Sequence, residues 1–266
     1  MNKKLKQSHR ERELIDTLRR LGGSARSADL AITLGVSEET VRRTIKALSK
    51  SGALERMYGG AYLAGPRDTH NFFHRIARHS TEKRRIALAV DHLLQDGMTL
   101  FLDVGFTTAF VAEKLRGYSN LTIATNSIGV AQVLANHNGN RVHFLGGEMQ
   151  TDKRGTFGFE TEQQSRKFAY DLAVFSADAL SERFGFLYLN AAEANLAAVI
   201  ASSAEKVAVV LDHHKFDQTA PHCGLDANLV DLLITDEPPG ESLARAIEAW
   251  NIEIHLAVGA DHDAPN

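Results

Sequence analysis

Apolar positions in the first 50 residues recur every three to four places, which is the spacing of one buried helix face. The pattern predicts a first helix over Arg10–Leu21, ended by a Gly-Gly pair. A second short helix begins at Ser27, which we expect to cap it, and stops at Gly35, which permits a tight turn. Ser37 can cap a third helix, because its hydroxyl can accept a hydrogen bond from a first-turn N–H. The expected buried positions of the three helices are Leu14, Ile15, Leu18, Leu21, Leu30, Ala31, Leu34, Val41, Ile45 and Leu48.

The third helix carries polar and basic residues off its apolar stripe, namely Thr40, Arg42, Arg43 and Lys46. Residues 52–62 follow this helix, alternate weakly and end in glycines, which suits a small β-hairpin wing. Two helices joined by a glycine turn, the second of them basic, form the arrangement that fits the major groove of DNA. Taken alone, Arg42 and Arg43 are two solvated helix arginines. On the outer face of this helix, within a basic segment, they indicate contact with double-stranded DNA.

Beyond Ser80 the pattern changes, and short apolar runs typical of buried strands alternate with helical segments. The expected strands are Met98–Leu102, Leu121–Ala124, Arg141–Leu145, Leu172–Ser176, Val207–Leu211, Leu232–Thr235 and Glu253–Leu256. The expected helices are Thr81–Leu94, Thr108–Leu115, Ile128–Ala135, Ala191–Ser203 and Gly240–Trp250. This alternation implies an α/β fold with a mainly parallel sheet, and such sheets bind ligands at the carboxyl ends of their strands.

The chain therefore divides into four expected parts. These are a small N-terminal winged helix-turn-helix domain over 1–62, a linker over 63–80, an α/β effector domain over 81–258 and a tail over 259–266. Charge follows this division, because residues 1–60 hold 13 Lys and Arg against 7 Asp and Glu, a net of +6, whereas the remainder nets −9. A basic segment joined to an acidic body suggests a polyanionic partner for the first and a different partner for the second. Surface lysines on a solvated helix explain the same charge, so charge alone leaves both interpretations open.

Composition limits the class of protein. The 266 residues are 44% hydrophobic and 24% charged, as in ordinary globular proteins, and no apolar run reaches the roughly 18 residues of a membrane span. The charged N-terminus lacks the apolar core of a secretory signal, and the single cysteine, Cys223, excludes an internal disulfide and a thiolate metal cluster. We therefore expect a cytoplasmic protein without membrane contact. The linker histidines His70, His74 and His79 lack a carboxylate or cysteine at fixed spacing, so no metal site is expected.

Four predicted strands end in polar or glycine-containing loops, which read LDVGFTT at 102–108, ATNS at 124–127, LGGE at 145–148 and LDHHKF at 211–216. Gly105 lets backbone N–H groups approach an anion, and Thr107 and Thr108 open a helix whose N-terminus is a ready phosphate site. Lys215 supplies a positive charge. Each loop alone fits ordinary turn and capping chemistry, whereas four at one sheet edge favour a ligand pocket. Neither GxxxxGK[ST] nor GxGxxG after a strand occurs, so no nucleotide cofactor is expected.

Residues 27–63, SADLAITLGVSEETVRRTIKALSKSGALERMYGGAYL, resemble the N-terminal domain of DeoR-family bacterial transcription regulators. The family pattern V-S-x-x-T-[IV]-R-R, then G-x-[IL]-x-R-x-x-G-G-A, is matched at Val36, Ser37, Thr40, Val41, Arg42, Arg43, Gly52, Leu54, Arg56, Gly59, Gly60 and Ala61. Thr44 stands where the family usually carries Asp, and Tyr58 where it usually carries His, which alters the expected operator preference. The resemblance implies DNA contacts from Ser37, Thr40, Arg42, Arg43, Lys46, Arg56 and Tyr58.

The strand-end loops extend the resemblance over nearly the whole chain, since the family's effector domain shows L-D-x-G-[ST]-T-[ST], T-N-S, G-G, D-x-x-K-F and I-T-D in this order. That domain resembles ribose-5-phosphate isomerase and the CoA-transferase fold, and it usually senses phosphorylated sugars or related metabolites. Phe106 replaces a small hydroxyl residue and adds bulk at the pocket mouth. Glu193 keeps an acidic position of the family, but Ala197 lacks its lysine, so either His213 and His214 compensate or the ligand is less anionic. The implied pocket residues are Asp103, Gly105, Phe106, Thr107, Thr108, Asn126, Ser127, Gly146, Gly147, Glu193 and Lys215.

These patterns support one principal hypothesis, a DNA-binding transcriptional regulator, expected to be a repressor of a metabolic operon, controlled by a small polar, phosphorylated sugar-type effector. Two operator half-sites require two recognition helices, so we expect a homo-oligomer, either dimer or tetramer. The alternative is a sugar-phosphate isomerase-like enzyme with a DNA-binding appendage, in which Asp103 or Glu193 acts as the base. The missing lysine argues against catalysis, so we expect no catalytic residue and no cofactor. A third hypothesis is an architectural DNA binder without a ligand.

Overall fold

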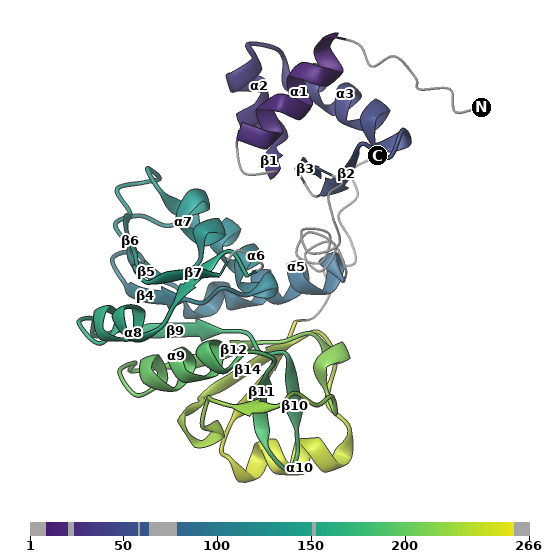
Figure 1. The fold of residues 1–266 in the computed structure, drawn as a ribbon. Coiled ribbons are helices and arrows are strands. Elements are labelled where there is room, and N and C mark those ends of the chain that lie inside the picture. Colours follow the sequence, from purple (N-terminus) through teal and green to yellow (C-terminus); the bar gives the residue numbers. More distant parts are fainter. Residues whose placement is uncertain (1–8, 21–23, 58, 64–78, 151–152, 258–266) are drawn as a thin grey trace. The chain divides into compact units, whose positions relative to one another are not determined.

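Contacts within the computed structural model divide the chain into two units, Met1–Arg78 and His79–Asn266, of which residues 9–20, 24–57, 59–63, 79–150 and 153–257 are described (Figure 1). Separate clusters of buried apolar side chains lie within each unit. Among the described residues, no helix is long and apolar enough to cross a membrane.

Helices α1 (His9–Arg20), α2 (Ser27–Leu34) and α3 (Glu38–Lys50) of the first unit confirm the three helices that apolar spacing predicted. The wing is a three-stranded antiparallel sheet, in the order β1 (Ser24–Arg26), β3 (Gly60–Leu63) and β2 (Leu54–Met57), of which β1 was not predicted. The buried apolar residues of the unit are Leu14, Ile15, Leu18, Leu30, Ala31, Val41, Ile45, Leu48, Leu54, Ala61 and Tyr62. Leu34 is half-buried against them, and Leu21 lies outside the described residues.

The prediction that Ser27 caps the second helix is wrong. Arg26 occupies the N-cap position and makes no capping bond with its side chain, while Ser27 is buried in the first turn. The reason is that β1 runs directly into α2, so the Ser27 N–H reaches the carbonyl oxygen of Gly59 in the wing, at 2.7 Å. The expected turn at Gly35 is confirmed, with a left-handed φ of 63° that favours glycine.

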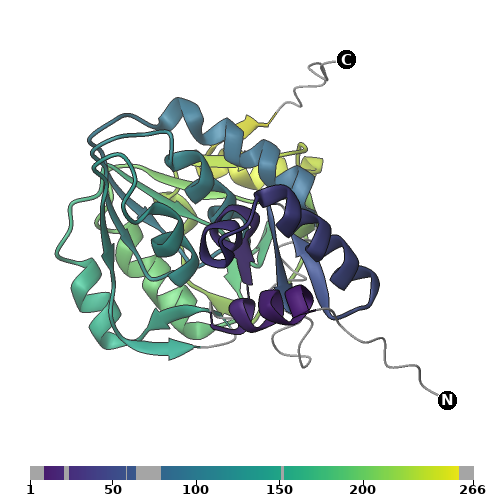
Figure 2. The ribbon, with the colours of Figure 1, turned by 90° about the horizontal axis from the view of Figure 1, so that it is seen from above.

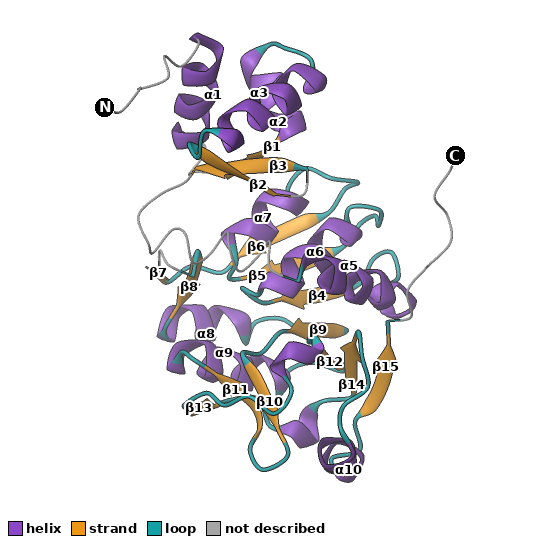
Figure 3. Cartoon of the chain, turned by 90° about the vertical axis from the view of Figure 1, so that its right-hand side faces the viewer, coloured by secondary structure: helices purple, strands orange, loops and turns teal. Residues whose placement is uncertain are grey.

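The second unit contains a seven-stranded parallel sheet, which confirms the expected α/β class (Figures 1 and 3). All seven strands were predicted from their apolar runs. In spatial order they are β15 (Glu253–Leu256), β14 (Leu232–Thr235), β12 (Val207–Val210), β9 (Leu172–Phe175), β4 (Thr99–Leu102), β5 (Thr122–Thr125) and β6 (Arg141–Phe144). The order places the carboxyl ends of β12, β9, β4, β5 and β6 side by side at one edge.

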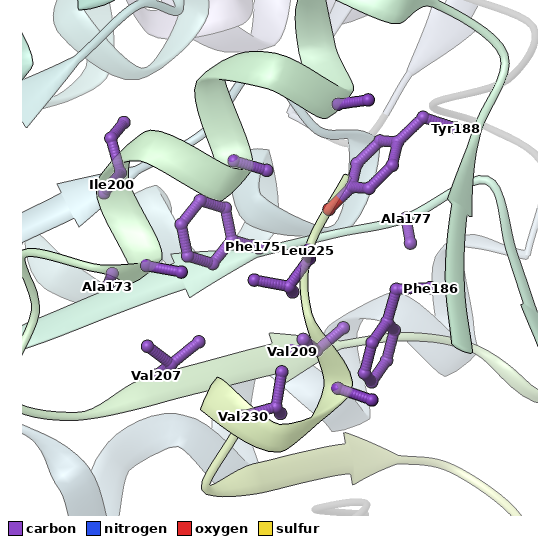
Figure 4. Packing of buried hydrophobic residues seen from close by; sticks show 14 of the residues in the cluster. Ala173, Phe175, Ala177, Phe186, Tyr188, Ile200, Val207, Val209, Leu225 and Val230 are labelled. Carbon is purple, nitrogen blue, oxygen red and sulfur yellow. The ribbon is translucent and has the colours of Figure 1, made fainter. Parts of the chain in front are cut away.

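Helices cover both faces of this sheet, and each face has a hydrophobic core. One face packs against α5 (Ser80–Ala89), the short helix η1 (Val90–Leu93), α6 (Phe106–Leu115) and α7 (Ile128–Leu134), which lie between the viewer and the sheet in Figure 2. The other face packs against α9 (Ala191–Ala201) and α10 (Glu241–Ala249). Figure 4 shows part of this second core, with Phe175 and Val209 of the sheet and Ile200 of α9 among the labelled residues.

Several short elements of the second unit were not predicted. They are the hairpin of β7 (Glu148–Gln150) and β8 (Gly155–Phe157), helix α8 (Phe159–Ser165), and the antiparallel sheet of β10 (Ala179–Ser181), β11 (Gly185–Tyr188) and β13 (His222–Cys223) (Figure 3). The predicted helix over 81–94 is also divided, since its last turn is the tighter η1. Two further short helices, η2 (His213–Lys215) and η3 (Ala227–Leu229), follow β12 and β13.

Gly224 holds β13 against the first turns of α9, which gives a test of the packing. A Cβ at position 224 would lie 2.4 Å from both the Cα and the carbonyl oxygen of Ala194, so the backbone of α9 must move to admit it. We expect Gly224→Ala to lower the free energy of unfolding by about 1–3 kcal/mol, as overpacking does. Urea unfolding measures the change. Gly240→Ala is the control, because a Cβ there meets nothing within 4 Å, and equal losses in the two variants would contradict the packing.

Candidate functional site

Helix α3 is oriented by its cap and its buried face. The Ser37 side chain caps it, accepting a hydrogen bond from the Thr40 N–H at 3.2 Å, as the sequence predicted. Val41, Ile45 and Leu48 are buried. Arg42, Arg43 and Lys46 consequently face solvent from the opposite side of the helix.

The two arginines of α3 are held by glutamates one turn before them. Arg42 Nη2 lies 2.6 Å from Glu38 Oε1, and Arg43 Nε lies 3.1 Å from Glu39 Oε1. The arginine side chains are 61% and 81% exposed, and exposed helix pairs of this spacing stabilise by only about 0.3–0.5 kcal/mol. The pairs therefore orient both guanidinium groups at the helix surface without preventing transfer to a phosphate or a base.

The wing packs closely on the backbone of β1. A Cβ at Gly60 would lie 2.1 Å from the carbonyl oxygen of Ala25, so only glycine fits there. Arg56 is exposed on β2. The remaining DNA-contact candidate of the wing, Tyr58, lies outside the described residues.

At the carboxyl edge of the large sheet, Asp103 links the loops after β4 and β9. Its Oδ2 accepts a hydrogen bond from the Ser176 N–H at 2.8 Å. A Cβ at Gly105 would lie 2.1 Å from Ser176 Oγ and 2.8 Å from Asp103 Oδ1, so glycine is required for this close approach. Burial raises the pKa of Asp103 to about 7, and the charge of Glu193 acts in the same direction.

The two threonines of the LDVGFTT loop, Thr107 and Thr108, are buried, and Thr108 caps the N-terminus of α6. Thr108 Oγ1 accepts from the Gly105 N–H at 2.9 Å and donates to the Asp103 carbonyl at 3.2 Å. The N–H of Gly105 itself is thus bonded within its own loop. Phe106 is half-buried, and Lys83 Nζ of α5 lies 5.7 Å from the centre of its ring.

The loops after β5 and β6 are joined through the β7–β8 hairpin. Asn126 Nδ2 donates to the Thr156 carbonyl at 3.1 Å, and Ser127 Oγ caps α7 by accepting from the Val130 N–H at 3.3 Å. The Gly146 N–H donates to Gln164 Oε1 at 2.9 Å. Gly147 has a φ of 144°, and a Cβ there would lie 2.2 Å from Thr161 Oγ1.

Several polar atoms at this edge are buried and have no hydrogen-bond partner among the described residues, and three of them follow β4, follow β5 or lie on β11. These three are Asp103 Oδ1, Asn126 Oδ1 and the hydroxyl of Tyr188 on β11. Burial raises the pKa of Tyr188, and the charges of Asp103 and Glu193 raise it further. An unpartnered buried polar atom is costly, so this cluster suits a ligand rich in hydroxyl groups. The sequence did not single out Tyr188 or Ser176.

Glu193 lies at the start of α9 and is paired. Lys153 Nζ lies 3.1 Å from its Oε1 and 3.3 Å from its Oε2, with the two side chains 17% and 13% exposed. Ala197, which stands where the family usually carries Lys, is buried one turn further along α9. The cation beside Glu193 is Lys153 of the hairpin, which the sequence analysis did not identify.

The loop after β12 carries the remaining candidates. Lys215 is half-buried in η2, and its N–H donates to the Asp212 carbonyl at 3.0 Å. His213 Nδ1 lies 2.8 Å from Asp236 Oδ2; burial lowers the pKa of His213, but this bond and the nearby carboxylates raise it overall. Three possible metal ligands, from His213, Asp236 and Glu237, lie within 4.8 Å of one another. One of them, Asp236 Oδ2, is also 3.5 Å from Arg85 Nη2, with which it forms an ion pair. The absence of a metal stays a prediction.

A cavity of about 610 Å³ lies at the opposite, amino edge of the sheet. Three carboxylates that line it accept hydrogen bonds from backbone N–H groups. Asp96 accepts from Ser119 at 2.8 Å, Asp171 from Thr99 at 2.6 Å and Asp231 from Val207 at 2.7 Å. Each of these carboxylates has a backbone partner, whereas Asp103 Oδ1 and Asn126 Oδ1 at the carboxyl edge have none among the described residues.

Two family models match the chain, the DeoR-like helix-turn-helix domain over residues 10–66 and the DeoR C terminal sensor domain over residues 78–237. The chain is 32% identical to the HTH-type transcriptional repressor CsqR of Escherichia coli (strain K12), covering 86% of this chain and 87% of that protein. It is 29% identical to the glycerol-3-phosphate regulon repressor of the same strain, covering 95% and 100%. A solved D-ribose-5-phosphate isomerase in complex with phospho-erythronic acid aligns with 52% of this chain and 54% of that chain, at 19% identity and a TM-score of 0.39.

The raised pKa of Asp103 predicts a change in the pH dependence of stability. An unfolded aspartate titrates near pH 3.9, so between about pH 4 and 7 the folded state holds a proton that the unfolded chain has lost. This contribution to stability disappears as the pH rises through about 7. Between pH 5 and 8 the free energy of unfolding of the wild type should fall by about 2.5 kcal/mol more than that of Asp103→Asn, which stays uncharged. Urea unfolding at the two pH values measures the difference. An unchanged profile, or an equal change in the exposed control Asp96→Asn, would contradict this.

Proposed function

The chain belongs to the DeoR family of transcription regulators, and we propose that it represses a metabolic operon under the control of a small phosphorylated sugar or polyol. In this proposal residues 1–62 bind the operator, residues 63–80 form the linker, residues 81–258 bind the effector and residues 259–266 form a tail. Such a protein acts in the compartment that holds the chromosome.

Operator binding is assigned to α3 and the wing. Arg42, Arg43 and Lys46 face solvent on the side of α3 opposite its buried stripe, and Arg56 is exposed on the wing. Ser37 and Thr40 lie at the N-terminus of α3, which is the end that recognition helices present to base edges. Because each operator half-site takes one such helix, we propose that the protein acts as a dimer or tetramer.

The observation that carries the effector proposal is that Asp103 Oδ1, Asn126 Oδ1 and the Tyr188 hydroxyl are buried without a hydrogen-bond partner among the described residues. Hydroxyl groups of a ligand can donate to Asp103 Oδ1 and Asn126 Oδ1 and can accept from the Tyr188 hydroxyl. A relative that covers nearly the whole chain is named for glycerol 3-phosphate, a phosphorylated polyol. We therefore propose a ligand of this chemical class, and a coupling of about 1–3 kcal/mol between the two sites would suffice for regulation.

We also propose that the protein does not turn its effector over. Thr108 and Ser127 are engaged in helix capping, and the relatives named above are transcriptional repressors. An isomerase needs a base beside a substrate carbon, and Asp103 and Glu193 are the two carboxylates placed for that role. Turnover of pentose or hexose phosphates above about 1 s⁻¹ by the purified protein would favour the enzyme instead.

Two double variants of α3 should change DNA affinity in opposite directions. Arg42→Ala together with Arg43→Ala removes two cations, so binding to a duplex obtained by in vitro selection should weaken at least tenfold and the slope of affinity against salt should fall by about 2. Glu38→Gln together with Glu39→Gln releases the same arginines and should tighten binding. Fluorescence anisotropy at several salt concentrations measures both. If the two double variants shift affinity in the same direction, or not at all, α3 is not the contact surface.

The effector assignment is tested by operator release. Glycerol 3-phosphate, ribose 5-phosphate and glucose 6-phosphate are titrated into the complex of protein and selected duplex, with the unphosphorylated parents beside them. At least one phosphorylated compound should change the operator affinity by roughly fivefold or more, as couplings of this kind do. Asn126→Leu should abolish that response, because it removes the unpartnered oxygen while leaving the α3 surface intact. No response to any compound would contradict the proposal, and normal DNA binding without a response would favour the architectural alternative.

A further inference from the structure

The β7–β8 hairpin is fixed at one side of the polar edge. The Thr156 N–H donates to the Asn126 carbonyl at 3.0 Å, and the Arg154 carbonyl accepts from the Ile128 N–H at 3.1 Å. A Cβ at Gly155 would lie 2.9 Å from Val104 Cγ2, so the hairpin backbone lies directly against the loop after β4. These contacts place Arg154 and Gly155 beside the loops that follow β4 and β5.

The same hairpin reaches across to the first turn of α9. Gln150 Oε1 accepts from Asn190 Nδ2 at 2.8 Å, and Lys153 Nζ pairs with both oxygens of Glu193 at 3.1 and 3.3 Å. Both members of the ion pair are more than four-fifths buried. Glu193 is the single charged residue of α9, so the helix itself supplies no cation to the edge.

Two carboxylates, those of Asp103 and Glu193, belong to the proposed effector site at the carboxyl edge. The charge of Glu193 raises the pKa of Asp103, and both charges raise the pKa of Tyr188. A phosphorylated ligand would meet repulsion there unless a cation is released to it. The Lys153 ammonium group, which can donate three hydrogen bonds, now holds two oxygens of one carboxylate, and two oxygens of a phosphate can replace them.

Resting on the effector class proposed above, we propose that Lys153 binds the phosphate group of the ligand and that Glu193 occupies the place of that phosphate until the ligand arrives. Binding is then an exchange of anions on one ammonium group. The exchange selects for a ligand that carries a phosphate next to its hydroxyl groups, and it loosens the contact between the hairpin and α9.

Four full-length variants separate this role from a purely structural one. Lys153→Met removes the cation, Lys153→Arg keeps it, and Glu193→Gln removes the competing charge while keeping the shape of the side chain. Lys114→Met is the matched control, because Lys114 Nζ lies 3.1 Å from Asp91 Oδ1 in an ion pair on the opposite face of the sheet. Inorganic phosphate, glycerol 3-phosphate and uncharged glycerol are the probes, and calorimetry measures their binding.

We expect Lys153→Met to weaken the binding of inorganic phosphate and glycerol 3-phosphate by roughly 10- to 100-fold, the loss typical of hydrogen bonds to a charged group. Lys153→Arg should retain most of the affinity, Glu193→Gln should tighten it, and Lys114→Met should leave it unchanged. Affinity for glycerol should not depend on Lys153. Opposite effects of Lys153→Met and Glu193→Gln on phosphate affinity would indicate that phosphate replaces Glu193 on Lys153. If the ion pair were only structural, removing either partner would change the affinity in the same direction.

Three results would overturn this assignment. The first is wild-type affinity for phosphate in Lys153→Met, the second is equal weakening in Lys153→Met and Glu193→Gln, and the third is no binding of inorganic phosphate or glycerol 3-phosphate by the wild type. The proposed function is measured separately, by the operator response to the sugar-phosphate panel. A regulator that responds to a sugar phosphate equally well with Lys153→Met would retain the proposed function and lose only this inference.

Discussion

The hydrogen bond from the Ser176 N–H to Asp103 Oδ2 joins the two central strands of the large sheet at their carboxyl ends. The other oxygen of the same carboxylate is buried and has no hydrogen-bond partner among the described residues. The close approach needs a glycine at 105, and it needs parallel strands, because only then do neighbouring loops meet at one edge. The ligand chemistry proposed for the second unit follows from this one arrangement.

The first unit uses a different physical device. Its arginines are exposed and paired within α3, so little free energy is needed to release them to DNA. The polar groups of the sensor unit are buried, where an unpartnered atom or a competing charge has a large effect. Weak exposed pairs suit a surface that must bind and release a polyanion, and buried groups suit a site that must discriminate between small molecules.

The sequence predicted the regular elements well and the connections poorly. A strand such as Leu232–Thr235 is buried on both faces and therefore shows as a continuous apolar run. Helix α3 is buried on one face and therefore shows an apolar stripe every three to four residues. Strands β7, β8, β10 and β13 have only two or three residues, too few for an apolar pattern to show. Ser27 was misassigned as a cap because β1, which feeds directly into α2, was not recognised. Asp103, Asn126 and Glu193 were found from motifs, whereas Lys153 is 40 residues from Glu193 and only tertiary structure brings the two together.

A crystal structure of the full chain with a sugar phosphate that releases it from DNA tests the central claim most directly. The account predicts ligand hydroxyl oxygens at about 2.7–3.0 Å from Asp103 Oδ1 and Asn126 Oδ1, at the carboxyl edge of the sheet. A ligand bound instead in the cavity at the amino edge, beside Asp96 and Asp231, with the atoms of the carboxyl edge still unpartnered, would contradict it.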